Sequence, residues 1–152
     1  MKFTLNHQVV DWPVRPDETL LEMLREGGIH SARSGCDTGN CGVCTVWVDE
    51  KPVLSCGYPA TRAEGKSVTT LEGVLDEASE IMDALAAQGA DQCGYCSPGL
   101  IMTILAMKRD LPHPTPEQMD EYLAGCLCRC TGYMSQRRAL QKLMERSVSS
   151  HE

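Results

Sequence analysis

Cysteine is the residue type that most constrains what this chain can fold into. Nine of its 152 residues are cysteines, and they fall into three groups. The first group is Cys36, Cys41, Cys44 and Cys56, the second is Cys93 and Cys96, and the third is Cys126, Cys128 and Cys130. In a reducing compartment, such an excess of thiols indicates metal binding rather than disulfides.

The N-terminus and the hydropathy of the chain indicate a cytoplasmic location. The N-terminal segment has no continuous apolar core and no small-residue cleavage site, so no signal peptide is predicted. No apolar stretch approaches the ~18–20 residues that span a bilayer, so we expect no membrane insertion by this chain. The formal net charge is −7 and there is no basic run, which argues against a nucleic-acid partner.

The first half of the chain alternates between strand and helix patterns. Two short strands are predicted on either side of a tight turn at Asn6 and His7. A helix is predicted over 17–28, with Asp17 as its N-cap and two glycines at its end. Further strands are predicted over 44–48, 52–56 and 67–71. Two strands, a helix and further strands are typical of an α+β fold rather than a parallel α/β sheet.

From residue 71 onward the apolar residues recur with helical spacing. Ser97 and Thr115 each precede a proline, the order expected at a helix N-terminus, and Gln118 completes a capping box with Thr115. Four helices are predicted, over 76–89, 97–110, 115–125 and 135–147. Their short connections favour a four-helix bundle. We therefore predict two domains, residues 1–75 and residues 76–152.

The first cysteine group has the spacing of a plant-type iron–sulfur site. Cys36, Cys41 and Cys44 form a C-x4-C-x2-C motif. Cys56 supplies a fourth thiol after eleven intervening residues. This pattern is typical of a [2Fe–2S] cluster, whose two irons take four thiolates. Glycines in the loop let it wrap closely around the cluster and turn backbone N–H groups toward its sulfurs.

A structural zinc site is the main alternative for the first group. Zinc ligands usually come in pairs at two separate knuckles, whereas three of these four cysteines share one loop. A phosphate-binding loop is a weaker alternative, because the segment lacks the lysine of that motif and does not lead into a helix.

The second and third groups supply enough thiols for another four-thiolate site. Cys93 and Cys96 alone resemble a thioredoxin-type dithiol, but that interpretation leaves the third group unexplained. Pairing them with two of the three late cysteines explains more residues, and both segments fall between predicted helices. Spacing alone allows three pairs from Cys126, Cys128 and Cys130. We predict no histidine ligands, because no histidine is paired with a nearby cysteine as in Rieske centres. The four histidines are His7, His30, His113 and His151.

Three segments in order resemble one known family. "GCDTGNCGVCTV", "QCGYCSPGLIM" and "CLCRCTGY" are similar to the motifs of the [2Fe–2S] small subunit of the molybdenum hydroxylases, the xanthine dehydrogenase and aldehyde oxidoreductase family. The similarity covers nearly the whole chain. It implies an N-terminal ferredoxin-like β-grasp domain followed by a helical domain with four helices, each domain holding one cluster.

The same resemblance implies roles for eight cysteines and one glutamine. The outer cluster would be ligated by Cys36, Cys41, Cys44 and Cys56, and the inner cluster by Cys93, Cys96, Cys128 and Cys130. Gln92 would reach the pterin of a molybdopterin cofactor held by a partner subunit, and Cys130 would lie next to that pterin. The family usually has Asn where this chain has Cys126, so we expect Cys126 to be a spare, buried thiol.

Two clusters in one short chain indicate an electron-transfer subunit rather than a site of substrate conversion. Little of the chain remains for a substrate pocket, and the sequence has no convergent set of catalytic bases. The resemblance implies a large molybdopterin-binding subunit at one end, and an FAD-binding medium subunit or a cytochrome as acceptor at the other. It also implies hydroxylation of a purine-like N-heteroaromatic compound or an aldehyde. The alternatives are a free-standing ferredoxin-like carrier and a zinc-stabilised interaction module.

Overall fold

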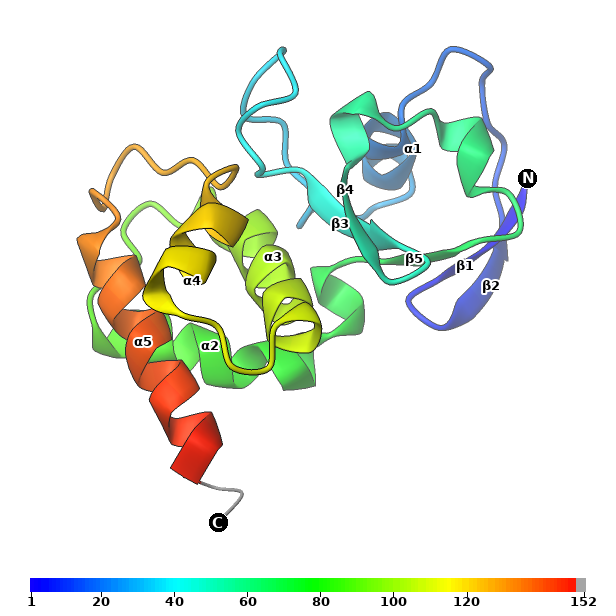
Figure 1. Ribbon diagram of the computed structural model, residues 1–152. Coiled ribbons are helices and arrows are strands. Elements are labelled where there is room, and N and C mark those ends of the chain that lie inside the picture. The colour runs from blue at the N-terminus through cyan, green and yellow to red at the C-terminus, as the bar shows by residue number, and fades with distance from the viewer. Residues whose placement is uncertain (150–152) are drawn as a thin grey trace.

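The first half of the protein is a five-stranded sheet with one helix packed against it (Figure 1). The computed structural model describes residues 1–149, so His151 and the end of the predicted second domain lie outside the described residues. The strands are β1 (Lys2–Leu5), β2 (Gln8–Asp11), β3 (Thr45–Val48), β4 (Lys51–Leu54) and β5 (Ser67–Thr69). Their order is β2-β1-β5-β3-β4, with β1 and β5 parallel and the other neighbours antiparallel.

Two tight hairpins set the register of this sheet. The turn between β1 and β2 is Asn6-His7, and the turn between β3 and β4 is Asp49-Glu50. All four residues have positive φ angles, which two-residue hairpins of the I′ type require at their central positions. The predicted strands and the predicted turn at Asn6 and His7 are therefore confirmed.

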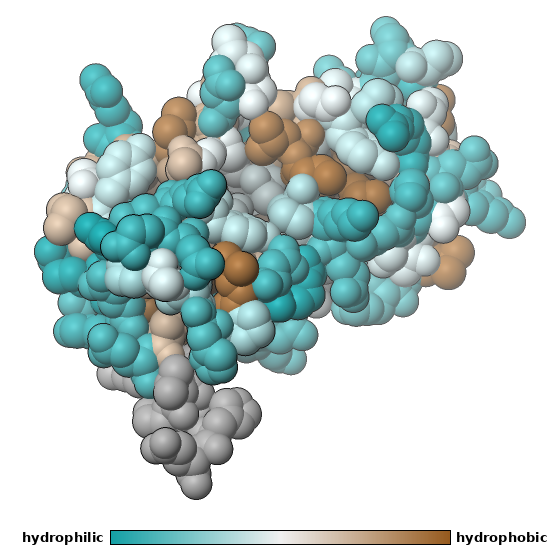
Figure 2. Space-filling view, viewed as in Figure 1, coloured by the Kyte–Doolittle hydropathy of each residue, from teal (hydrophilic) through white to brown (hydrophobic). Residues whose placement is uncertain are grey.

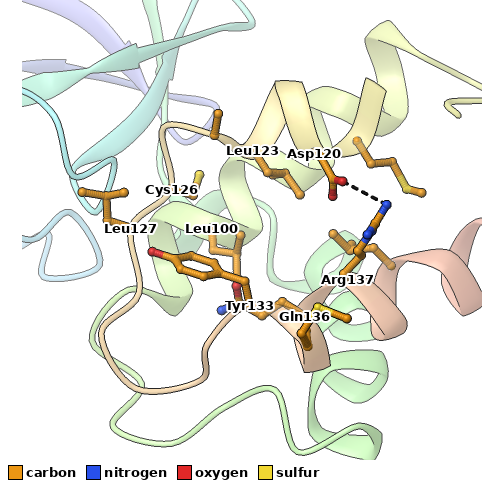
Figure 3. A pocket seen from close by; sticks show the side chains of 12 residues that line it. Leu100, Asp120, Leu123, Cys126, Leu127, Tyr133, Gln136 and Arg137 are labelled. Carbon is orange, nitrogen blue, oxygen red and sulfur yellow. Dashed lines mark ion pairs between the residues drawn. The ribbon is translucent and has the colours of Figure 1, made fainter. Parts of the chain in front are cut away.

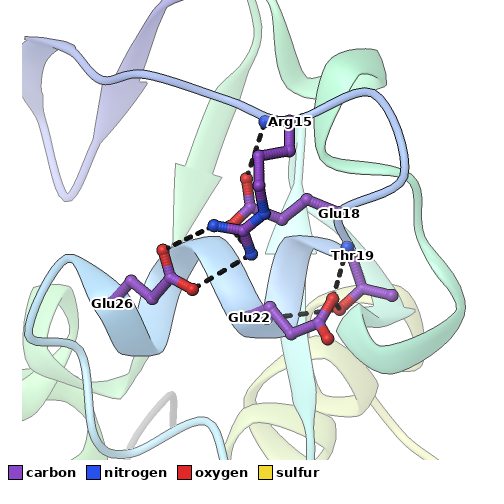
Figure 4. Close-up of polar contacts among 5 residues, drawn as sticks. All are labelled: Arg15, Glu18, Thr19, Glu22 and Glu26. Carbon is purple, nitrogen blue, oxygen red and sulfur yellow. Dashed lines mark hydrogen bonds and ion pairs between the residues drawn. The ribbon is translucent and has the colours of Figure 1, made fainter.

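Helix α1 (Leu20–Glu26) begins at a different residue from the predicted one. Thr19, not Asp17, is the N-cap: its hydroxyl accepts from the Glu22 N–H at 3.2 Å, and the Glu22 carboxylate accepts from the Thr19 N–H at 2.8 Å (Figure 4). Arg15 pairs through two nitrogens with Glu26, which ties the approaching chain to the helix. This reciprocal capping box satisfies the backbone N–H groups of Thr19 and Glu22. The box needs Thr19 at the N-cap position, so Asp17, two residues earlier, is not the cap.

The second half contains four helices that share one core. They are α2 (Leu75–Ala87), α3 (Ser97–Asp110), α4 (Pro116–Leu123) and α5 (Met134–Ser149). Together with α1 they make five helices, and the mixed α+β class is confirmed. The most deeply buried core side chains include Ile81, Ile104, Met107 and Leu143. Short 3-10 turns lie at Ser55–Gly57, Ala60–Ala63 and Leu71–Gly73.

The helix starts agree only in part with the predicted caps. Thr115 caps α4 and forms the predicted capping box with Gln118. Ser97 is not the cap of α3, because Cys96 occupies the N-cap position. The Ser97 hydroxyl instead donates to the Asp91 carboxylate at 3.0 Å.

Helix α3 joins the two halves by packing against β3 (Figure 1). The Trp47 indole N–H donates to the Met102 carbonyl at 3.0 Å, and the Arg109 guanidinium lies 5.1 Å from the Trp47 ring centre. A side-chain carbon at Gly99 would collide with the Gly42 carbonyl and come within 2.8 Å of the Val43 Cα. Only glycine at position 99 therefore allows this close approach.

The face seen in Figure 2 is mostly hydrophilic, with small apolar patches in the upper part of the view. Within residues 1–149, no helix is both long enough and apolar enough to cross a membrane.

Candidate metal centres

The first cysteine group surrounds one end of the β3–β4 hairpin. Cys36, Cys41 and Cys44 lie in the loop between α1 and β3, and Cys56 lies in the 3-10 turn directly after β4. The hairpin pairs Thr45 with Leu54, so the residues next to this pair are also brought together. As a result, the Cys44 and Cys56 Sγ atoms are 3.3 Å apart. Cys36 and Cys41 form a second thiol–thiol contact in the same loop.

The loop supplies hydrogen-bond donors to one of these thiols. Backbone N–H groups of Thr38, Asn40 and Cys41, together with the Cys41 thiol, lower the pKa of Cys36 to about 6. Burial acts in the opposite direction on Cys56 and raises its pKa to about 11. Donors directed at a thiolate favour its charged form. The loop therefore presents N–H groups to negative sulfur, as predicted from its glycine-rich sequence.

The second site is built from two connections between helices. Cys93 and Cys96 lie between α2 and α3, and Cys128 and Cys130 lie between α4 and α5. The Cys93 and Cys130 Sγ atoms are 3.5 Å apart, and the Cys96 thiol contacts the Cys128 thiol. Burial raises the pKa of Cys96 to about 12.

Two side chains hold the segment that carries Cys128. The Thr131 hydroxyl donates to the Cys128 sulfur at 3.2 Å. The Cys128 backbone N–H donates to the Tyr133 hydroxyl oxygen at 2.9 Å. Both contacts come from residues of the "TGY" segment that follows the last cysteine, so this segment fixes the thiol's position.

The arrangement of the thiols is compatible with a dinuclear cluster at each site. In the part of the chain that the structure describes, no three Cys, His, Asp or Glu side chains converge as the ligands of one ion would. The thiols instead form two pairs at each site. A [2Fe–2S] cluster has four thiolate ligands, two on each iron, so paired thiols are compatible with such a group at each site.

Cys126 is the cysteine that joins neither set. Its half-buried thiol contacts the Thr103 hydroxyl on α3, and burial raises its pKa. The side chain packs against the core of the helical half and lines a groove beside α4 (Figure 3). The half-buried side chain therefore lies against apolar neighbours, and its role as a spare thiol stays a prediction.

Gln92 is exposed and directly precedes Cys93. Its predicted partner, a pterin on another subunit, is not part of this chain, so its role stays a prediction. Cys130 is exposed at the same end of the helical half.

The contacts that link the two sites could not be predicted from the sequence. The Leu127 N–H donates to the Cys41 carbonyl at 2.9 Å, which links the two cysteine-bearing segments. Arg33 and Tyr95 form a second link, through hydrogen bonds to backbone carbonyls. Contacts made to backbone atoms do not depend on the partner's residue type, so no motif could reveal them.

Comparisons with known proteins identify both halves as cluster-binding domains. A family model described as "2Fe-2S iron-sulfur cluster binding domain" matches residues 3–71, and one described as "[2Fe-2S] binding domain" matches residues 70–141. The chain therefore has two [2Fe–2S]-binding domains, which favours iron–sulfur clusters over zinc.

Individual relatives match nearly the full length of the chain. The nicotinate dehydrogenase small FeS subunit of Eubacterium barkeri is 38% identical, over 98% of this chain and 97% of that protein. The xanthine dehydrogenase iron-sulfur-binding subunit of Escherichia coli O157:H7 is 45% identical, over 86% of this chain and 84% of that protein.

The fold has a close counterpart among solved structures. A chain in the crystal structure of quinoline 2-oxidoreductase from Pseudomonas putida 86 superposes with a TM-score of 0.88 and 32% identity, over 98% of this chain and 95% of that chain. Fold, domain models and relatives agree: the chain belongs to the family of [2Fe–2S] small subunits of the molybdenum hydroxylases, the iron–sulfur subunits of molybdenum-containing oxidoreductases.

Proposed function

We propose that this chain relays single electrons between a molybdenum site on a large subunit and an acceptor on another subunit. Each [2Fe–2S] cluster, when bound, would accept and donate one electron at a time. The proposed ligands are Cys36, Cys41, Cys44 and Cys56 for the outer cluster, and Cys93, Cys96, Cys128 and Cys130 for the inner one. The chain itself would convert no substrate.

One hydrogen bond carries most of this proposal. Cys41 belongs to the first site, and Leu127 directly precedes Cys128 of the second site. Because the Leu127 N–H donates to the Cys41 carbonyl at 2.9 Å, covalent bonds and this single hydrogen bond join the Cys41 thiol to the Cys128 thiol. Two sites that belonged to unrelated functions would have no need for such a direct connection.

Exposed apolar side chains around the inner site support docking of a large subunit there. Among the described residues, seven large apolar side chains are exposed, and four lie in or beside the two loops that carry the cysteines of the inner site. These four are Tyr95, Leu127, Tyr133 and Met134. A groove of about 460 Å³ opens beside them, between α4 and α5 (Figure 3). Exposed apolar surface of this kind marks interaction sites.

The proposed large subunit carries molybdopterin, with Gln92 against the pterin and Cys130 adjacent to it. The outer site would face an FAD-binding medium subunit or a cytochrome. The named relatives act on nicotinate, xanthine and quinoline, which are all N-heteroaromatic compounds. We therefore favour a purine-like or other N-heteroaromatic substrate over an aldehyde, and a cytoplasmic complex.

We also propose that the two domains divide as residues 1–75 and 76–152 and that α2 to α5 act as a four-helix bundle. Support comes from the sheet, which ends with β5 at Thr69, and from α2, which begins the helical half at Leu75. The helices of that half share one apolar core.

Metal analysis of the purified protein tests the cluster proposal. We expect about four irons and four acid-labile sulfides per chain, a red-brown colour and two distinct EPR signals on reduction. A colourless protein that contains zinc would reject the proposal. A chain that carries both clusters but purifies without any large molybdopterin protein would support the free-standing carrier instead.

Gln92→Ala in the assembled complex tests the proposed pterin contact. We expect lower turnover with both cluster EPR signals intact, because Gln92 is proposed to contact the pterin and not the iron. Gln8→Ala is the matched control, since Gln8 is an exposed glutamine in β2 at the far edge of the sheet. Unchanged turnover in Gln92→Ala would exclude a functional pterin contact.

A further inference from the structure

Arg33 reaches from the first half of the protein to a loop of the second site. Arg33 lies three residues before Cys36 in the sequence, yet its Nη1 donates to the carbonyls of Gly94 at 2.6 Å and Tyr95 at 3.1 Å. These two residues separate Cys93 from Cys96. Arg33 therefore holds the loop that carries two thiols of the other site.

Tyr95 returns the contact. Its hydroxyl donates to the Ser34 carbonyl at 2.6 Å, and the Arg33 guanidinium lies 5.2 Å from the centre of its ring. The side chains of Arg33 and Tyr95 thus each donate to backbone carbonyls of the segment that carries the other residue. Hydrogen bonds from a guanidinium are stronger than neutral ones, and a cation over an aromatic ring adds further attraction.

The loop held by Arg33 has few other constraints. Gly94 has a φ of +70°, so this position favours glycine and offers no side chain to pack. Tyr95 is 47% exposed, and Cys93 is exposed as well. A short exposed loop with so little packing of its own depends on contacts made from outside it.

We propose that Arg33 is a positioning residue for the inner cluster, acting from the opposite domain. The inference rests on the proposed cluster sites and goes beyond them, because no thiol of the inner site belongs to the domain of Arg33. Outer-shell contacts orient metal ligands and tune the metal. A fixed guanidinium beside the loop would also stabilise the added electron of a reduced cluster and raise its reduction potential.

The test compares three variants of the full-length holoprotein, purified with its accompanying subunits. Arg33→Gln removes the charge and the guanidinium donor, and Arg33→Lys keeps the charge without the planar guanidinium. Arg62→Gln is the matched control, because Arg62 lies 5.6 Å from the Tyr58 ring within its own domain. Iron content, EPR line shape and the reduction potential of each cluster are measured, with the inner signal assigned by its loss in Cys128→Ser.

We expect Arg33→Gln to disfavour reduction of the inner cluster about tenfold, which is ~59 mV for a one-electron couple. Its EPR signal should broaden, the outer cluster should be unchanged, and Arg33→Lys should restore the potential only in part. An inner potential and line shape in Arg33→Gln equal to those of Arg62→Gln would overturn the proposal. Full restoration by Arg33→Lys would overturn it as well, because charge alone would then account for the effect.

A milder variant covers the case in which Arg33→Gln does not accumulate. Tyr95→Phe removes only the hydroxyl bond to Ser34 and keeps the ring under Arg33. It should broaden the inner EPR signal to a smaller extent, and an unchanged signal would contradict the mutual brace. Wild-type protein without iron would reject the proposed function itself. Wild-type protein with four irons, together with an inner EPR signal that does not change in Arg33→Gln or Tyr95→Phe, would reject only the role of Arg33.

Discussion

The two candidate cluster sites are built in opposite ways. The first takes three of its four cysteines from one loop, and two of them are well covered, with Cys41 8% and Cys44 2% exposed. The second takes two cysteines from each of two helix connections, and Cys93 and Cys130 are exposed. The first site thus has two buried and two half-buried thiols, whereas the second has two half-buried and two exposed thiols.

This difference shows what each site needs in order to form. The first depends on one hairpin, because the β3–β4 register alone brings Cys44 to Cys56. The second depends on the packing of all four helices, since Cys93 lies in the connection between α2 and α3 and Cys130 in the connection between α4 and α5. The greater exposure of the thiols at the second site suits close contact with another subunit.

Removing the iron should have the largest effect and should separate the two sites most clearly. Metal binding couples to folding where the ligands do not hold together without the metal. We expect amide exchange to accelerate roughly 100-fold or more in both cysteine-bearing regions. The change should spread farther in the helical half, because the sheet keeps its hydrogen-bond ladder. Hydrogen exchange of the holo and chelated proteins measures this, and native protection in both halves after chelation would contradict it.

Serine substitutions in the third cysteine group should separate ligands from the spare thiol. We expect Cys128→Ser to lose about two irons per chain and the inner EPR signal, because a cluster needs four thiolates. Cys126→Ser should keep all four irons and both signals, since its thiol contacts Thr103 and no other cysteine. Iron analysis and EPR check both variants. Loss of two irons in Cys126→Ser would mean that Cys126 has replaced one of the proposed ligands.

Gly99→Ala should weaken the contact between the two halves. An added Cβ would strike the backbone of Gly42 and Val43, which cannot move aside as a flexible side chain could. We expect a loss of about 1–3 kcal/mol in the free energy of unfolding, typical of overpacking. Gly57→Ala is the control, because nothing lies within 4 Å of its added carbon. Denaturant unfolding of both holo variants provides the measurement. Equal stability of Gly99→Ala and Gly57→Ala would show that the close approach at Gly99 does not stabilise the contact between the two halves.

The smallest effects should come from the two capping boxes. Thr19→Ala and Thr115→Ala should each cost about 1 kcal/mol at neutral pH. Bonds from Thr19 lower the pKa of Glu22, so that part of the stability is present above the ordinary pKa of Glu and disappears on acidification. The Thr115 box uses Gln118, which does not titrate, although the Thr115 hydroxyl also contributes to lowering the pKa of the neighbouring Glu117.

Unfolding measured across this pH range distinguishes the two boxes. The cost of Thr19→Ala should shrink as the pH falls through the lowered pKa of Glu22. The cost of Thr115→Ala should shrink less, because the Gln118 side chain accepts from the Thr115 N–H at every pH. Parallel pH dependence in both variants would show that the Glu22 carboxylate contributes nothing specific to its box.

Local chemistry allowed much of this protein to be predicted from its sequence. The Asn6-His7 turn, the short strands and the Thr115 box depend on neighbouring residues, and all are confirmed. The spacing of Cys36, Cys41 and Cys44 predicted the type of cluster, and both family models agree. The caps at Asp17 and Ser97 were wrong because several nearby polar residues can compete for one helix start.

Only the tertiary structure decided how distant segments meet. Spacing allowed any pair of the three late cysteines, but packing of the chain after α4 places the Cys126 thiol against Thr103 and leaves Cys128 and Cys130 beside other thiols. The Arg33–Tyr95 brace and the Leu127–Cys41 bond likewise depend on α3 lying against β3. Such contacts join residues far apart in the chain, and no local pattern of residues encodes them, because each arises from the packing of the whole fold.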